Sequence, residues 1–342
     1  MNFILFLLFL IPINGLQYKL SQYKQIQLYN NYDTSGFYEK PIFPNNPIKP
    51  SKKESIKKLI RVESTLPTLL LCFSGGWITT PSFINLLTSR TFLVSSINIV
   101  FVMYVSMIIN DIFDLEVDRY NNPTRPLVTG QIKVKEAIGY TCLLMFVIEY
   151  SAYLFLPFQL RKYLRLSLLN VFLYTPFLKK ITIVKNISCA FLVAFSIYFS
   201  GLSTTPRIII DKSKMKLLAI VSRLIFFGSF MNEILLDIRD REGDKKQNII
   251  TIPVKYGNEN AWRVTVSLLS TNLLWNSFEI AKLYGTMRTS FFTILFIPFY
   301  VNILKIKKDN YSLKTLKHFL QESTKYLFFI LVYLCSLAKP IK

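Results

Sequence analysis

Two stretches of this sequence place acidic side chains at helical spacing, each at the end of a long apolar run. The first reads NDIFDLEVDRYNNPTRPLVTG and begins at Asn110. On a helix, Asn110, Asp114 and Asp118 share one face, with Asp111 close to Asp114. The helix should end near residues 121–123, Asn-Asn-Pro, because a proline disfavours helix in the residue before it. We therefore expect a polar stripe on the last turns of a largely apolar helix.

The second stretch reads NEILLDIRDREGDKKQNIITIPVKYG and begins at Asn232. Within it, Glu233, Asp237, Asp240 and Asp244 form a single stripe along about three turns of a helix. Four carboxylates at this spacing repel one another strongly where water is scarce. A bound cation would relieve that repulsion.

Two facing carboxylate stripes would suit a magnesium diphosphate, because Mg²⁺ is a hard ion that takes one or two protein carboxylates together with phosphate oxygens. Basic residues near the stripes could neutralise the diphosphate as it leaves; they are Arg125, Lys180, Arg239, Lys245 and Lys246. The alternative is that the carboxylates only pair with arginines at a membrane surface. Two clusters in matching positions argue against it, because acidic residues are costly in such an apolar chain.

The elements that carry these motifs are expected to be membrane helices. The 342 residues are 51% hydrophobic and 15% aromatic, and only 18% are charged, as is typical of a membrane protein. Apolar segments near the length that crosses a bilayer recur along the chain. They lie approximately at 64–86, 93–113, 136–157, 162–178, 186–203, 216–236, 262–282, 287–304 and 322–338. We therefore expect an all-α membrane protein with about nine transmembrane helices.

The charge distribution predicts the orientation of these helices. The net charge is +21, which in a soluble protein would suggest nucleic-acid binding. Here the basic residues gather before the first span and in alternate loops, on the same face as both acidic motifs. By the positive-inside rule, this face lies in the cytosol or its organellar equivalent.

The cysteines and the histidine do not suggest further chemistry. Cys72, Cys142, Cys189 and Cys335 fall inside expected spans without CxxC spacing, so neither a disulfide framework nor a zinc site is indicated. A single histidine, His318, cannot form a metal site or a triad by itself.

The N-terminal region has a different composition from the rest. Residues 1–16 contain a short apolar run typical of a signal peptide, an organelle leader or a simple anchor. Residues 17–60 are rich in Tyr, Asn, Lys and Pro and are expected to form a poorly ordered linker. The transmembrane domain would then occupy residues 61–342, in a plastid, an endomembrane or another membrane.

Taken together, the motifs resemble those of the UbiA superfamily of intramembrane prenyltransferases. The resemblance rests on Asn110-Asp111-x-x-Asp114-x-x-x-Asp118, Asn122-Pro123, Arg125-Pro126, the run YTPFLKKITIVKN from Tyr174, and Asp237-x-x-Asp240-x-x-x-Asp244. It extends from about Arg61 to the last span. The family implies nine helices around a central cavity that opens sideways into lipid.

The resemblance also implies roles for individual residues. Asn110, Asp114 and Asp118 would hold one Mg²⁺, and Asp237, Asp240 and Asp244 the other, with Asp114, Asp118, Asp240 and Asp244 central to catalysis. Arg125, Lys180 and Lys245 would contact the diphosphate, and Tyr174 would line the cavity near it. Asp111 and Glu233 are supporting candidates.

The implied reaction is Mg²⁺-dependent transfer of a prenyl group from a prenyl diphosphate, geranylgeranyl or similar, to a lipophilic acceptor among the membrane lipids, without nucleic acid. The motifs are most similar to those of enzymes that attach geranylgeranyl groups to glycerol-phosphate lipids. The first also resembles that of chlorophyll synthase, and the second that of homogentisate prenyltransferases. Outside this reaction class, an ion-coupled transporter and an inactive relative remain alternatives.

Overall fold

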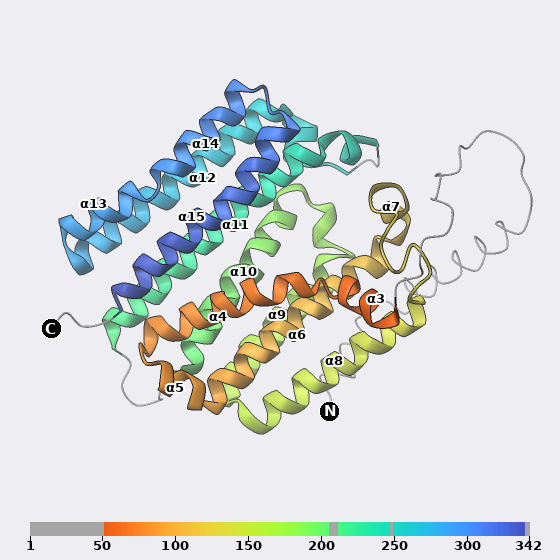
Figure 1. The fold of residues 1–342 in the computed structure, drawn as a ribbon, viewed down its shortest axis with the longest axis horizontal. Coiled ribbons are helices and arrows are strands. Elements are labelled where there is room, and N and C mark those ends of the chain that lie inside the picture. The colour runs from red at the N-terminus through yellow and green to blue at the C-terminus, as the bar shows by residue number, and fades with distance from the viewer. Residues whose placement is uncertain (1–50, 205–210, 247–248, 339–342) are drawn as a thin grey trace, which may run out of the picture. The chain divides into compact units, whose positions relative to one another are not determined.

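The computed structural model describes residues 51–204, 211–246 and 249–338 of the chain (Figure 1). One compact unit begins at Lys52, nine residues before the expected start at Arg61. Residues 52–59, expected to belong to a poorly ordered linker, form helix α3 (Lys52–Leu59). This helix is ordered because Leu59 is fully buried and Lys52 pairs with Glu136. Residues 1–16 and most of the expected linker lie outside the described residues.

Every regular element in the described part of the chain is a helix. After α3 come the short helix η1 (Val62–Ser64), α4 (Thr65–Thr79), α5 (Phe83–Thr88), α6 (Arg90–Phe113), α7 (Leu115–Asn121), α8 (Val134–Phe155), α9 (Phe158–Tyr174), η2 (Leu178–Lys180) and α10 (Thr182–Thr204). The second part comprises α11 (Lys212–Lys246), α12 (Ile252–Tyr284), α13 (Thr286–Ile294), α14 (Ile297–Lys308) and α15 (Leu313–Ser336). The expectation of an all-helical chain is confirmed for these residues.

Within the described residues, five helical segments are long and apolar enough to cross a membrane: α6, α8, α10, α11 and the combined α13–α14 segment. The other expected spans fall on α4, α9, α12 and α15. Helix α4 has only 15 residues and α9 only 17. The expected number of nine spans is therefore not established by helix length and hydropathy.

Helix boundaries follow local sequence signals. The Ser89 hydroxyl accepts a hydrogen bond from the Phe92 backbone N–H at the start of α6, and Ser312 does the same for Thr315 at the start of α15. Gly257 has φ 83° and ψ 163°, which breaks the helical path near the start of α12. These signals fix where the long apolar helices begin and bend.

The helices pack in two groups that meet along α10 and α11 (Figure 1). Helices α4, α6, α8, α9 and α10 form one group, and α11, α12, α14 and α15 form the other. The backbones of α4 and α10 meet closely, because a Cβ atom on Gly75 would lie 2.0 Å from the carbonyl oxygen of Ile197. Small residues allow such close approach between membrane helices, where packing replaces the hydrophobic effect.

Helix α11 is long enough to carry the second motif beyond the apolar core. Its 35 residues at a rise of about 1.5 Å correspond to roughly 50 Å, compared with about 30 Å for the hydrocarbon layer. A helix of this length is longer than the layer is thick, and its C-terminal turns contain Asp240 and Asp244.

Candidate active site

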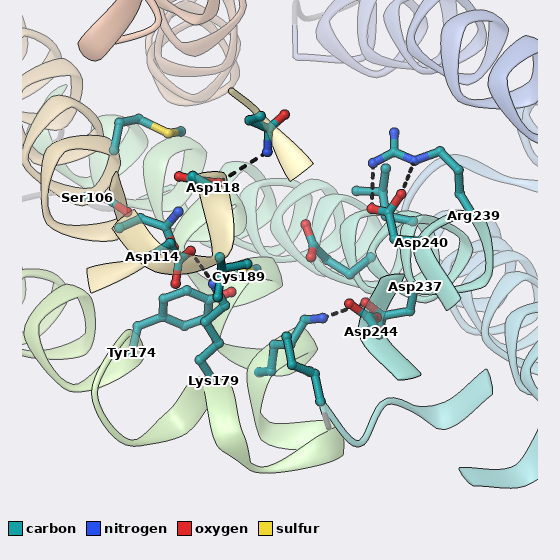
Figure 2. A pocket seen from close by; sticks show the side chains of 18 of the residues that line it. Ser106, Asp114, Asp118, Tyr174, Lys179, Cys189, Asp237, Arg239, Asp240 and Asp244 are labelled. Atoms are coloured by element: carbon teal, nitrogen blue, oxygen red, sulfur yellow. Dashed lines mark hydrogen bonds and ion pairs between the residues drawn. The ribbon is translucent and has the colours of Figure 1, made fainter. Parts of the chain in front are cut away.

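A polar cavity of about 400 Å³ lies where α6, α7, α9, η2, α10 and α11 come together (Figure 2). Its walls include the acidic residues Asp114, Asp118, Glu233, Asp237, Asp240 and Asp244 and the basic residues Arg61, Arg125, Lys179, Lys185 and Arg239. Figure 2 shows Asp114 and Asp118 on one side and Asp237, Asp240 and Asp244 on the other. The two motifs thus face each other across one cavity.

The first motif is divided between two helices. Helix α6 ends at Phe113, and Asp114, with φ −90° and ψ 7°, leaves the helical path before α7 begins. Helix α7 ends at Asn121, as the Asn-Asn-Pro sequence predicts. The bend leaves Asp114 and Asp118 on the cavity wall, whereas Asp111 is only 2% exposed and does not line it.

Basic side chains neutralise the carboxylates of the first motif. Lys179 of η2 donates a hydrogen bond to Asp114, and Arg125 donates to Asp118 at 2.7 Å and also to Asp111. Arg61 donates to Asp111 at 3.0 Å. Burial raises the pKa of the Asp118 carboxyl, although the nearby Arg125 charge acts in the opposite direction.

The second motif forms one stripe on α11, as its spacing predicts. Asp237 accepts hydrogen bonds from Lys185 at 2.5 Å and from Asn186 at 2.9 Å, so it is held from α10. Asp240 pairs with Arg239 through two hydrogen bonds of 2.7 Å. The Oδ2 atom of Asp244 is buried and has no hydrogen-bond partner among the described residues.

Glu233, Tyr174 and Cys189 also line the cavity. Glu233 precedes Asp237 by one helical turn and lies next to Cys189, which in turn neighbours Tyr174. In the described part of the chain, Glu233 forms no ion pair within 4 Å. A carboxylate, a thiol and a phenol therefore lie next to one another on the cavity wall.

The donor set of the cavity suits Mg²⁺ that is bound together with a diphosphate. All the acidic ligands are oxygen donors, which Mg²⁺ prefers, and Asp244 presents a buried oxygen without a partner. No group of three acidic, cysteine or histidine side chains lies close enough to hold an ion alone, within the ranges that the structure describes. Phosphate oxygens would have to complete the coordination, and lysines and arginines that could balance their charge lie alongside.

The structure brings most of the expected site residues together and leaves two outside. Asn110, Asp114, Asp118, Asp237, Asp240, Asp244, Arg125 and Tyr174 all line the cavity. Lys180 and Lys245 are exposed and do not line it. Successive residues of a short 3₁₀ helix such as η2 point about 120° apart, so only one lysine of the Lys179-Lys180 pair can face Asp114.

Three basic cavity residues were not assigned from the sequence: Arg61, Lys179 and Lys185. Lys179 is adjacent to Lys180, the expected diphosphate contact, and the sequence has no signal that distinguishes the two lysines. Lys185 follows the same loop into α10. Arg61 belongs to the boundary segment before η1, and its partner Asp111 lies 50 positions away in the sequence.

Comparison with known proteins agrees with this geometry. The model of the UbiA prenyltransferase family matches residues 68–338, which is most of the chain. The chain belongs to the UbiA prenyltransferase family. The expectation of a membrane prenyltransferase is thereby confirmed.

Relatives within the family include digeranylgeranylglyceryl phosphate synthases. The chain is 28% identical to digeranylgeranylglyceryl phosphate synthase of Methanocaldococcus jannaschii over 260 residues, covering 76% of this chain and 88% of the relative. It is 24% identical to the enzyme of the same name from Saccharolobus solfataricus, covering 72% and 84% of the two chains.

Solved structures share the fold of this chain. A structure of digeranylgeranylglyceryl phosphate synthase aligns with a TM-score of 0.66 at 24% identity, covering 84% of this chain and 98% of the other. A UbiA homologue from Archaeoglobus fulgidus, solved with DMAPP and Mg²⁺, aligns with a TM-score of 0.59 at 20% identity, covering 81% and 99%. The UbiA fold of this family member is therefore clear from structure as well as from sequence.

Proposed function

We propose that this family member transfers a prenyl group, in a Mg²⁺-dependent reaction, from a prenyl diphosphate to the hydroxyl group of a glycerol-phosphate lipid. The observation that supports it is the meeting of two carboxylate stripes across one cavity, with basic side chains between them. Geranylgeranyl diphosphate or a donor of similar length is the expected prenyl source.

The ion pairs of the cavity indicate how a diphosphate would be held. Lys179 and Lys185 each neutralise one motif carboxylate, Asp114 and Asp237. With Mg²⁺ bound to these carboxylates, the two ammonium groups would be available to phosphate oxygens. In this arrangement Mg²⁺ would balance the carboxylates, and the lysines would balance the diphosphate. We therefore expect magnesium and diphosphate together to bind better than Mg²⁺ alone or diphosphate alone.

The proposed ligands follow the two stripes. Asn110, Asp114 and Asp118 would hold one Mg²⁺, and Asp237, Asp240 and Asp244 would hold a second. Bound there, Mg²⁺ would supply charge stabilisation to the departing diphosphate. Arg125 and Lys179 would bind its oxygens, in place of the more distant Lys180 and Lys245.

The remaining chemistry belongs to the cavity walls. The bond between the first prenyl carbon and the diphosphate oxygen breaks, and the electron pair leaves with the diphosphate. The acceptor oxygen then forms a bond to that carbon and passes its proton to the departed diphosphate. Tyr174 on the cavity wall would face the cationic carbon with its ring, and the apolar surroundings would keep water from competing.

The acceptor is proposed from the relatives. Digeranylgeranylglyceryl phosphate synthases are among the curated proteins most similar to this chain, and they match over most of their length. A glycerol phosphate that carries one prenyl chain is lipophilic enough to enter from the membrane and has a free hydroxyl group to accept a second chain.

The proposal also includes the membrane arrangement. The nine apolar segments would all cross the bilayer, including the four on α4, α9, α12 and α15. The cavity would open on the lysine-rich face, which the positive-inside rule assigns to the cytosol or an equivalent compartment.

The test is a transfer assay with purified protein in lipid vesicles. Labelled geranylgeranyl diphosphate is offered with a panel of acceptors: a prenylated glycerol phosphate, chlorophyllide, homogentisate, hydroxybenzoate and a naphthoate. We expect product only with the glycerol phosphate, only with Mg²⁺ present, and none after treatment with a chelator.

Matched variants separate the metal site from general damage. Asp114→Asn and Asp240→Asn should each lower turnover by roughly a hundredfold or more, the scale of lost transition-state charge stabilisation. Glu242→Gln, at an exposed position on the same helix as Asp240, should leave turnover unchanged. Full activity in either aspartate variant would refute the metal assignment, and product from an aromatic acceptor would refute the acceptor.

A further inference from the structure

Arg61 is the one basic side chain of the cavity that is not paired with an expected metal ligand, within the described residues. Four other cations each pair with such a carboxylate: Lys179 with Asp114, Arg125 with Asp118, Lys185 with Asp237, and Arg239 with Asp240. Arg61 pairs instead with Asp111, which does not line the cavity. Arg61 therefore does not neutralise an expected metal ligand.

The backbone at Arg61 is held in an unusual conformation. Its φ of 51° and ψ of 60° lie in the left-handed region, which costs an L-residue other than glycine about 1 kcal/mol. The conformation turns the chain sharply between α3 and η1 and brings the arginine to the cavity wall. A glycine would adopt this conformation without strain, whereas an arginine adopts it at a local cost.

Asp111 fixes the direction of the guanidinium group. Arg61 Nη2 lies 3.0 Å from Asp111 Oδ1, and Arg125 donates to the same oxygen. The two guanidinium groups are thus immediate neighbours. Arg125 also pairs with Asp118, an expected metal ligand, whereas Arg61 pairs with Asp111. Because the Arg61 side chain remains 30% exposed, it can still accept a ligand from the cavity.

We propose that Arg61 binds the phosphate group of the acceptor lipid and that Asp111 positions it for this task. The proposal rests on the proposed function, in which the acceptor is a glycerol phosphate. Such an acceptor brings a second anion into a site that already contains a diphosphate, and it needs a cation of its own.

The chemistry of the acceptor explains why this cation lies next to the diphosphate site. In a glycerol phosphate, the reacting hydroxyl and the phosphate ester are separated by only a few covalent bonds. When the hydroxyl reaches the prenyl carbon, the phosphate must therefore lie close to the departing diphosphate. An arginine adjacent to Arg125 meets this requirement, and its planar donors match phosphate oxygens.

The experiment compares Arg61→Gln with Arg125→Gln in the vesicle transfer assay. For Arg61→Gln, we expect the KM for the prenylated glycerol phosphate to rise about tenfold or more, while the KM for the prenyl diphosphate stays within twofold. Arg125→Gln should show the opposite pattern. Arg61→Lys, which keeps the positive charge, should recover part of the acceptor affinity.

A second measurement uses an acceptor that lacks its phosphate. The wild-type protein should have a higher kcat/KM for the prenylated glycerol phosphate than for the corresponding prenylated glycerol. In Arg61→Gln, the ratio of these two values should fall at least tenfold. Asp111→Asn should lose preference in the same direction without changing the Mg²⁺ concentration needed for half-maximal activity. A structural defect alone would lower the rates with both acceptors equally.

The outcomes distinguish the two proposals. If the wild-type protein uses the glycerol phosphate but Arg61→Gln raises the donor KM, Arg61 is a diphosphate ligand and the inference is overturned. If preference for the phosphate is unchanged in Arg61→Gln, the inference is overturned as well. If the wild-type protein transfers prenyl groups only to aromatic acceptors, the proposed function fails, and the inference about Arg61 fails with it.

Discussion

Lys185 near the start of α10 donates a hydrogen bond of 2.5 Å to Asp237 on α11, and this pair connects the two groups of helices at the cavity. The side chains are only 13% and 5% exposed. A pair buried to this extent contributes little net stability while it is intact, but the loss of one partner leaves the other charge uncompensated.

We therefore expect Lys185→Gln to destabilise the metal-free protein by about 3–5 kcal/mol, because Asp237 loses its cation. Added Mg²⁺ should restore part of the loss, since the ion neutralises the same carboxylate. Thermal melting in detergent, with and without Mg²⁺, measures both effects. The control is Arg239→Gln, whose more exposed pair with Asp240 should matter by less than about 1 kcal/mol. Equal losses in the two variants would contradict the importance of burial.

The adjacent lysines of η2 provide a matched pair for a kinetic prediction. Lys179 reaches Asp114 in the cavity, whereas Lys180 is exposed. Lys179→Gln should lower kcat/KM for the prenyl diphosphate by roughly 10- to 100-fold, the scale of one charge-assisted hydrogen bond. Lys180→Gln should remain within twofold of the wild-type value. A larger effect at Lys180 would mean that η2 turns when substrate binds.

Close packing of α4 against α10 predicts an effect of adding one methyl group. Gly75→Ala would place a Cβ atom 2.0 Å from the Ile197 carbonyl oxygen, so the helices must separate. We expect a loss of about 1–3 kcal/mol or more, seen as a lower melting temperature. Gly139→Ala on α8 has no heavy atom within 4 Å of the new Cβ and should stabilise the helix by about 0.5–1 kcal/mol. Similar melting temperatures for the two variants would rule out the close contact.

A surface cluster beyond the cavity predicts a pH dependence. Glu259 accepts hydrogen bonds from Lys307 at 2.9 Å and from Tyr311 at 2.7 Å, and these lower its pKa from 4.5 to about 2. Because the folded-state pKa lies below the unfolded value, the contribution to stability is present above pH 4.5 and is lost as the pH falls toward 2.

Melting curves of the wild-type protein and Glu259→Gln should therefore differ by a constant amount from pH 7 to pH 5 and converge below that. The difference should be small, because the side chains are exposed to solvent. The double variant Glu259→Gln/Lys307→Gln should melt close to Glu259→Gln throughout. A difference that persists unchanged near pH 2 would show that the cluster does not depend on ionised Glu259.

The sequence by itself determined the class of fold and the chemistry of the motifs. Continuous apolar runs of this length favour helices in a membrane, because a helix satisfies its own backbone hydrogen bonds without water. The spacing within residues 233–244 was sufficient to predict one acidic stripe, since α11 is a continuous helix there. The helix end near Asn122-Pro123 was equally readable, because proline restricts the residue before it.

Only the tertiary structure decided which residues meet across the cavity. The break at Asp114 between α6 and α7 occurs without a proline or glycine, so the sequence does not predict it. The choice between Lys179 and Lys180 depends on the rotation of η2, and the pairing of Arg61 with Asp111 joins residues 50 positions apart. Local sequence fixes spacing along a helix, whereas rotation and distance between helices come from packing. The partners of the acidic stripes therefore emerge only in the folded protein.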